Sequence, residues 1–277
     1  RGEPQILMPP GYGLLSYPVY VMVQNIEMAG MAVSIFGYLG TVLIAFLIGR
    51  RLFGELAGLL SAAFVVFCPV LLAYSYVTLS DSLFVFVYFL GFYFLLSVLA
   101  DEPDSARLLH VGKYLALGVI LGLASLIRPE AYLPSLLAFG WLLVVAVVRR
   151  QRTELLLVIG AFLLFAVVNL PYFVFIHEQT GKWLFSTKVG YNLVIGEKVT
   201  KGSEYVDRYL AAHPNLIVES LEINLFDYVQ RDVPEFVQRL RTNLKQVVWE
   251  LSRLLWHALV PLALIWLIFP VFGRAPL

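Results

Sequence analysis

Long apolar runs separated by short polar loops make up most of this chain. A helix of about 20 apolar residues can cross a bilayer. Seven runs are close to that length, namely residues 29–49, 56–77, 82–100, 112–127, 131–148, 154–176 and 255–273. Residues 11–27 are also apolar, but they contain Pro18 and end in a polar cluster, which favours a partly buried or interfacial helix over a full span. The pattern predicts an all-α polytopic membrane protein with about seven transmembrane helices and an interfacial N-terminal helix.

The long stretch between the sixth and seventh runs shows helical periodicity with polar residues between the apolar ones. In "VPEFVQRLRTNLKQVVWELSRLLW" the apolar residues recur on one helix face, and Pro234 suits a first helical turn. We predict amphipathic helices on or near the membrane surface, either as a cap or as a lid over a site. The predicted organisation is a transmembrane core over residues 1–176, an extracytoplasmic amphipathic segment over 177–253, and a final span with a cytoplasmic end over 254–277.

The composition agrees with this class. Of the 277 residues 60% are hydrophobic and 14% are charged, whereas about 25% are charged in ordinary soluble domains. The net charge of +1 predicts no nucleic-acid partner, and the single cysteine, Cys68, excludes an internal disulfide.

Arginine-rich loops predict the orientation of the bundle. They are "GRRLFGE" at residues 49–55 and "RRQRTE" at 149–154, and the mixed loop 100–113 adds Arg107 and Lys113. These loops follow alternate spans, and short loops rich in Lys and Arg face the cytoplasm. The opposite, extracytoplasmic side then carries residues 1–28, the turn at Asp81, the turn "RPE" and the stretch 177–253.

Charged side chains gather on that outer side, at the edge of the apolar bundle. They include Asp81, Arg128, Glu130 and Lys188. Each acid has a structural explanation, because acids stabilise helix N-termini, and Arg128 can extend to lipid head groups. Together they suit a lipid-linked phosphate substrate: cations stabilise a leaving phosphate, and a carboxylate takes the proton of an attacking hydroxyl. An ion pair that only locks two helix ends is the alternative for Arg128.

Four motifs occur in an order that resembles a known family. They are "PPGYGLL", "GRRLFGELAGLLSA", "TLSDSL" and "GLASLIRPEA". The set resembles the GT-C superfamily of membrane glycosyltransferases, in particular the protein O-mannosyltransferase and aminoarabinose-transferase-like branch called glycosyltransferase family 39. The resemblance covers residues 8–148 well and makes residues 1–176 a GT-C-like core. It implies that a sugar passes from a polyprenyl- or dolichyl-phosphate carrier to a protein, glycolipid or polysaccharide acceptor on the extracytoplasmic face.

The resemblance also suggests site residues. Asp81 matches the acid of the second outer turn, and Arg128 and Glu130 match an arginine-proline-acid turn. We predict that the catalytic residues are Asp81 and Glu130, and that the substrate-binding residues are Arg128, Lys188, Tyr132 and Tyr12. We further expect an integral, multi-pass protein in the plasma membrane of a bacterium or an archaeon.

The family has a further acid in an outer loop before the "PP" turn. We expect that the sequence given lacks the first span and most of that loop, and we assign no catalytic role to Glu3. Some relatives use a divalent cation, and His177 and Glu178 adjoin on the outer side. Two adjacent residues do not define a metal site, so we assign no cofactor and no metal ligand.

Two other classes of function stay open. A lipid or solute transporter also needs charges within a bundle, but the spans lack the paired interrupted helices of many transport sites, and the charges lie at one face. A non-catalytic subunit would keep the GT-C-like bundle and bind partners instead of substrates.

Overall fold

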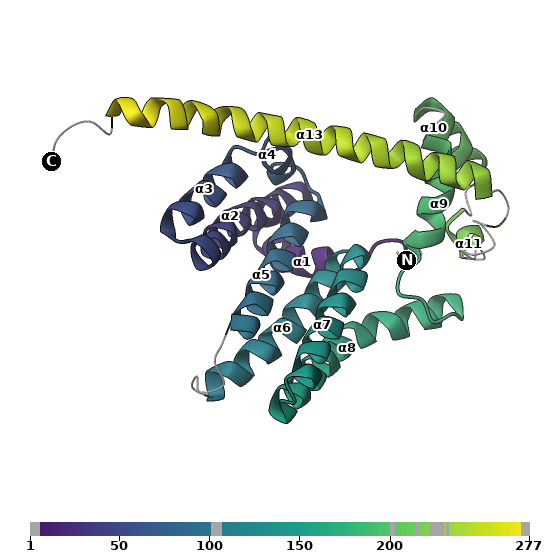
Figure 1. Cartoon of the computed structure of the whole chain (residues 1–277). Helices are drawn as coiled ribbons and strands as arrows, with labels where there is room; N and C mark the ends of the chain where they lie inside the picture. Colours follow the sequence, from purple (N-terminus) through teal and green to yellow (C-terminus); the bar gives the residue numbers. More distant parts are fainter. Residues whose placement is uncertain are drawn as a thin grey trace. The chain divides into compact units, whose positions relative to one another are not determined.

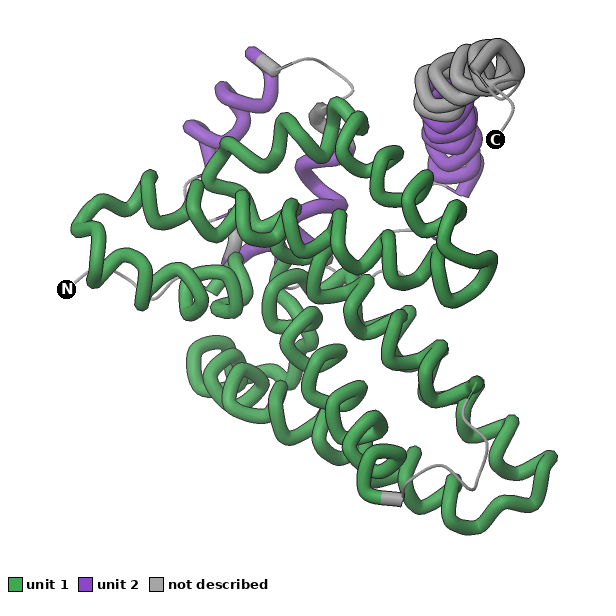
Figure 2. Tube along the Cα trace, turned by 90° about the vertical axis from the view of Figure 1, so that its left-hand side faces the viewer, with its two compact units in different colours: residues 1–188 green, residues 189–277 purple. Residues whose placement is uncertain are grey.

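The computed structural model describes residues 6–100, 107–199, 203–213, 216–221, 230 and 233–272. These residues form helices and connecting turns, without a strand among them. The chain divides into two compact units, residues 1–188 and residues 189–277 (Figure 2). The elements of the first unit are α1 (Gly11–Val23), α2 (Ile26–Phe53), α3 (Glu55–Val66), α4 (Pro69–Ser75), α5 (Ser80–Ala100), α6 (Arg107–Ile127), the 3₁₀ turn η1 (Pro129–Ala131), α7 (Tyr132–Val148) and α8 (Arg152–Thr180).

Five helical stretches of the first unit are long and apolar enough to cross a membrane. They are Ile26–Phe53, Ser80–Ala100, Leu108–Ile127, Pro129–Val148 and Arg152–Thr180. Each contains one of the spans expected from the sequence, so the prediction of an all-α, integral, multi-pass membrane protein is confirmed. The predicted N-terminal helix is α1, whose 13 residues are too few to cross a bilayer.

The expected span 56–77 differs from the structure. It forms two helices, α3 and α4, which are bent by 62° at Phe67 and Cys68. Pro69 explains the break, because proline has no N–H to donate and pushes the residue before it out of the helical region. Cys68 accordingly has extended backbone angles, φ −74° and ψ 109°. The described part of the chain therefore contains five spans, or six if the bent pair counts as one, and the predicted number of seven is not confirmed.

The seventh expected span, residues 255–273, falls at the end of α13 (Val233–Phe272). Side chains after Arg253 in this helix, and residue 273 itself, lie outside the described residues.

The helices of the first unit do not pack in the order of the chain. α2 packs against both α3 and α5, α6 packs against both α5 and α8, and α7 packs against α8 (Figure 1). The short α1 contacts α2 and α6. The ends of α1, α5 and α6 thus meet although they are distant in the sequence, and this meeting builds the candidate site.

Glycines allow the closest of these helix contacts. A Cβ atom at Gly118 of α6 would lie 2.2 Å from the carbonyl oxygen of Ala161 in α8. One at Gly37 of α2 would lie 2.6 Å from the backbone of Leu83 in α5. Small residues of this kind let membrane helices approach until their backbones touch. A Cβ atom at Gly11 would similarly lie 2.6 Å from the carbonyl of Leu126, so α1 starts directly against the end of α6.

Buried apolar side chains fill the space between α5, α6, α7 and α8. This cluster consists of Val98, Tyr114, Leu117, Leu121, Tyr132, Phe139, Leu142, Val158, Ala161 and Phe165. Large apolar side chains also cover the outside of the bundle, as with Leu133, Leu137 and Trp141 on α7, which are at least 60% exposed. A soluble monomer rarely exposes so continuous an apolar surface, whereas lipid tails cover it favourably.

The second unit contains α9 (Lys188–Val199), which begins at the last residue of the first unit, together with α10 (Ser203–Ala212), α11 (Leu216–Ser220) and α13. α9 and α11 approach closely, because a Cβ atom at Gly190 would lie 2.0 Å from the carbonyl oxygen of Ser220. Helices therefore occupy much of the segment 177–253, in which the sequence predicted them.

Candidate active site at the ends of α5 and α6

Arg128 joins two carboxylates at one end of the first unit. Its Nη1 donates a hydrogen bond to Oδ1 of Asp81, in the first turn of α5. Its Nη2 lies 3.3 Å from Oε1 of Glu130, and its Nε lies 3.5 Å from Oε2 of the same residue. The side chains of Arg128 and Asp81 are 26% and 28% exposed, and that of Glu130 is 48% exposed. The three residues therefore form a partly buried charged cluster.

The local sequence "IRPE" explains why Arg128 points toward α5. A residue before proline avoids the helical conformation, so Arg128 is extended, with φ −145° and ψ 128°, and α6 ends at Ile127. Its guanidinium also lies 5.7 Å from the ring centre of Phe84 in α5. Burial alone would lower the pKa of Arg128, but the hydrogen bonds and negative charges of Glu130 and Asp81 raise it. The side chain therefore stays cationic.

A cleft of about 830 Å³ opens beside this cluster. Its polar lining includes Tyr12, Asp81, Arg128 and Lys188. The rest of the lining is mostly apolar and comes from the start of the described chain, the α4–α5 turn, the end of α6 and the second half of α8. Those residues are Met8, Pro9, Pro10, Gly13, Leu14, Thr78, Leu79, Ser80, Ile127, Pro171, Tyr172 and Phe175. Cations at the margin of an apolar cavity suit an amphiphilic ligand with an anionic head group.

Lys188 reaches the cleft directly after a segment that hydrogen bonds hold in place. Its backbone N–H donates a 3.0 Å hydrogen bond to Oγ of Ser186. The hydroxyl of Thr187, which is almost fully buried, donates to the carbonyl of Ile6 at 2.6 Å. Lys188 is also close enough for its charge to act on Glu130. The cleft therefore has a second cation, supplied by a residue 60 positions after Arg128 in the sequence.

Tyr12 lines the cleft, and its hydroxyl connects α1 to α2. The hydroxyl donates to the carbonyl of Gly30 at 2.8 Å and lies 3.2 Å from Oγ of Ser34. Burial raises the pKa of Tyr12, and hydrogen bonds with Ser34 and Ser16 oppose this only in part. The phenol is therefore neutral at physiological pH and cannot serve as an anionic base.

Tyr132, which the sequence suggested as a substrate-binding residue, is not in the lining of the cleft. It is 7% exposed, donates a 2.8 Å hydrogen bond to Oδ1 of Asn169 and stacks on the ring of Phe173. Its ring also contacts Phe185, in the segment that leads to Lys188. The structure thus brings Asp81, Arg128, Glu130, Lys188 and Tyr12 together and keeps Tyr132 in the core beneath them.

A family model for dolichyl-phosphate-mannose-protein mannosyltransferases matches residues 8–174, more than half of the chain. The chain belongs to this family. The resemblance found in the sequence is thereby confirmed at the level of a GT-C glycosyltransferase. The family is one of membrane glycosyltransferases of the mannosyltransferase type, which take their sugar from a polyprenyl-phosphate carrier. No curated protein and no solved structure is significantly similar to the chain.

The family match includes most of the residues that line the cleft. It covers Tyr12, Asp81 and Arg128 of the lining, together with Glu130 beside it, and ends before Lys188. The charged cluster of Asp81, Arg128 and Glu130 therefore lies within the region that the family model matches. The second cation, Lys188, lies outside that region.

Sequence reasoning missed the contribution of α8 to the cleft. Pro171, Tyr172 and Phe175 form part of the lining, yet they occur within the apolar run that precedes His177 and Glu178. Pro171 was the available signal, because a proline inside a span interrupts the helical hydrogen bonds and often accompanies a cavity.

The described residues do not fit a metal site. They contain no group of three or more His, Cys, Asp and Glu side chains that could hold an ion. His177, one of the two residues considered from the sequence, stacks on the ring of Trp183 with 4.1 Å between ring centres. We therefore derive no catalytic step from a metal.

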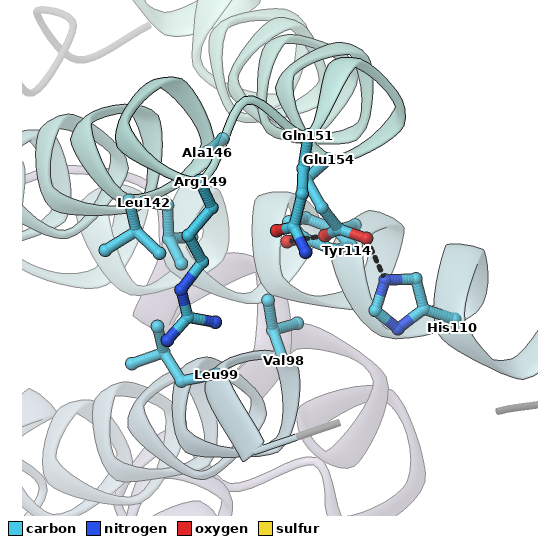
Figure 3. A pocket seen from close by; sticks show the side chains of 10 residues that line it. Val98, Leu99, His110, Tyr114, Leu142, Ala146, Arg149, Gln151 and Glu154 are labelled. Carbon is cyan, nitrogen blue, oxygen red and sulfur yellow. Dashed lines mark hydrogen bonds and ion pairs between the residues drawn. The ribbon is translucent and has the colours of Figure 1, made fainter. Parts of the chain in front are cut away.

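A second, much smaller cavity lies at the other ends of α6 and α8 (Figure 3). Nε2 of His110 is 2.8 Å from Oε1 of Glu154, and Tyr114 donates a 2.5 Å hydrogen bond to Oε2 of the same residue. The cavity measures about 50 Å³, which is room for a few water molecules and too little for a sugar. This cluster connects α6 to α8, and the larger cleft is the candidate active site.

Proposed function

We propose that this protein transfers a sugar from a polyprenyl- or dolichyl-phosphate carrier to an acceptor at the extracytoplasmic end of the bundle. The observation that carries the proposal is the cleft in which Arg128 and Lys188 line the same cavity as many apolar side chains. The apolar part suits the first isoprene units of the carrier, and the cations suit its phosphate. The acceptor is a protein, a glycolipid or a polysaccharide hydroxyl.

The reaction is a direct displacement at C1 of the sugar. The acceptor oxygen forms a bond to C1 on one side, and the bond between C1 and the phosphate oxygen breaks on the other, which inverts the configuration. The electron pair leaves with the lipid phosphate, whose charge Arg128 and Lys188 stabilise. The acceptor hydroxyl loses its proton to a carboxylate.

We assign the two carboxylates complementary roles. Asp81 lines the cleft and orients the acceptor hydroxyl or takes its proton. Glu130 binds two nitrogens of Arg128 and keeps the guanidinium directed at the phosphate. Oriented charges of this kind stabilise a transition state without further rearrangement.

The extracytoplasmic orientation is supported by the arginine-rich loops 49–55 and 149–154, which the positive-inside rule assigns to the cytoplasm. A transporter is less consistent with the site, because transport sites lie near the bilayer midplane and Arg128 stands between two candidate spans, at their ends.

Native mass spectrometry of the full-length protein tests the proposal. Polyprenyl phosphate is compared with phosphatidylglycerol as an anionic control lipid, in the wild-type protein, in Arg128→Ala and in Arg149→Ala. Arg149 lines the small cavity at the other end of the bundle, so its loss controls for a change in overall charge. Selective retention of polyprenyl phosphate that disappears in Arg128→Ala alone supports the proposal.

Equal retention of both lipids by all three proteins would make "RPE" a structural turn and favour the transporter or the subunit. A transfer assay then separates an enzyme from a subunit. The enzyme releases polyprenyl phosphate from polyprenyl-phosphate mannose in the presence of an acceptor, whereas a non-catalytic subunit binds the donor and leaves it intact.

A further inference from the structure

Tyr172 lines the cleft, and its hydroxyl is buried without a hydrogen-bond partner in the part of the chain that the structure describes. Tyr172 belongs to α8, lines the cleft and is 3% exposed. Its Oη is enclosed and has no partner among the described residues. The hydroxyls of Tyr12, Tyr114 and Tyr132, by contrast, are all hydrogen-bonded to protein groups. Among the described residues Ser82, Ser135 and His177 also have a buried polar atom without a partner, but only Tyr172 lines the cleft.

An unpaired buried hydroxyl is unfavourable, because it has lost its hydrogen bonds to water and gained none. Unpaired groups in native proteins are rare and often belong to a functional site. The hydroxyl cannot reach water by a simple rotation of the ring, because Tyr172 packs in one buried cluster with Leu126 and Ile176. Leu126 precedes Arg128 by two residues, so the same packing fixes the tyrosine beside the charged cluster.

We propose that Tyr172 Oη donates a hydrogen bond to an oxygen of the donor head group when the carrier occupies the cleft. The inference rests on the proposed function, and it adds a neutral, fixed donor to the two cations at the same cleft. The acceptor is an oxygen of the phosphate or of the sugar. A neutral donor at a fixed position recognises the geometry of a head group, whereas Arg128 and Lys188 recognise its charge.

The test compares the wild-type protein with Tyr172→Phe and Tyr114→Phe. Both tyrosines are 3% exposed, and each substitution removes one hydroxyl only. Tyr114 lies at the other end of α6 and donates its hydrogen bond to Glu154. The measurements, made on full-length protein in nanodiscs, are the Tm before ligand is added, the Kd for the two lipids polyprenyl phosphate and polyprenyl-phosphate mannose, and the Kd for phosphatidylglycerol as the control.

We expect Tyr172→Phe to keep or raise the Tm, because it removes an unpaired polar group, and Tyr114→Phe to lower it. We expect Tyr172→Phe to raise the Kd roughly 10-fold, the effect of a hydrogen bond to a charged or polar oxygen, and Tyr114→Phe to leave it unchanged. Weaker binding of both lipids identifies the phosphate as the acceptor, and weaker binding of the mannose-linked lipid alone identifies the sugar.

An unchanged Kd for both lipids in Tyr172→Phe overturns the inference, whatever happens to the Tm. A wild-type protein that does not prefer polyprenyl phosphate over phosphatidylglycerol would instead refute the proposed function itself. The two failures are thus distinguished by the wild-type measurement.

Discussion

Arg128 and Asp81 stand 47 residues apart in the sequence and form an ion pair between the turn after α6 and the first turn of α5. Each side chain is only about a quarter exposed, at 26% and 28%. Loss of one partner from a partly buried pair leaves an uncompensated charge, which is more costly than at an open surface. The pair therefore fixes two helix ends and also holds a cation at the cleft.

A double-mutant cycle measures how much this ion pair contributes to the free energy of unfolding. We expect Asp81→Asn and Arg128→Gln to show a coupling free energy of about 1–2 kcal/mol in denaturant unfolding in detergent. The matched control is the exposed pair Glu204 and Arg208, whose side chains are 93% and 79% exposed and whose coupling should not be measurable. If the two pairs showed the same coupling, the Asp81–Arg128 contact would not stabilise the bundle.

Lys188→Gln should weaken binding of polyprenyl phosphate and reduce its dependence on salt. The lysine lines the cleft, and the attraction between a cation and a phosphate is screened by ions. Titration of the lipid at two salt concentrations provides the measurement. Lys182→Gln is the control, because Lys182 lies in the same connecting segment but not in the lining of the cleft. Equal effects of both substitutions would mean that only the overall charge is important.

Gly13→Phe should block the cleft while the bundle stays folded. Gly13 lines the cleft, and a Cβ atom there meets nothing within 4 Å. The added ring therefore enters open space that we assign to the carrier, and lipid retention should be lost without a fall in Tm. Gly140→Phe introduces the same ring at an equally open position of α7 outside the cleft and should bind lipid normally. Normal retention by Gly13→Phe would exclude the cleft as the carrier site.

Gly118→Ala should destabilise the contact between α6 and α8 by about 1–3 kcal/mol, the usual cost of an overpacked contact. The reason is the 2.2 Å distance between the new methyl group and the carbonyl oxygen of Ala161, which only a backbone shift can relieve. Gly112→Ala, in the same helix, meets nothing within 4 Å and should keep or slightly raise the Tm, because alanine favours helix. Thermal unfolding that ranked the two variants in the opposite order would disprove this account of the contact.

Much of the site could be anticipated from short sequence segments. Asp81 precedes an apolar run and Arg128 and Glu130 lie on either side of a proline, so both segments had to fall at helix ends. From the sequence, an ion pair of Arg128 was only one of two alternatives. Its formation with Asp81 requires that the start of α5 lies next to the end of α6, which no local sequence pattern determines.

Tyr132 and Tyr172 show where sequence reasoning stopped. Tyr132 follows the "RPE" turn and looked like a site residue, but η1 turns its side chain toward Asn169 in the core. Tyr172 looked like an ordinary residue of a span, and it lines the cleft because α8 packs next to α6. No local pattern distinguishes these two environments.

The sequence by itself determined the helical class, five of the spans, the family and the ends at which charged residues gather, because hydropathy, proline and short motifs act within a few neighbouring residues. The tertiary structure decided the contact between α6 and α8 and the group of residues that shares one cleft. Those features depend on which helices lie side by side. Close contacts at glycines such as Gly118 and Gly37 determine the neighbours, and each contact joins residues that are far apart in the sequence.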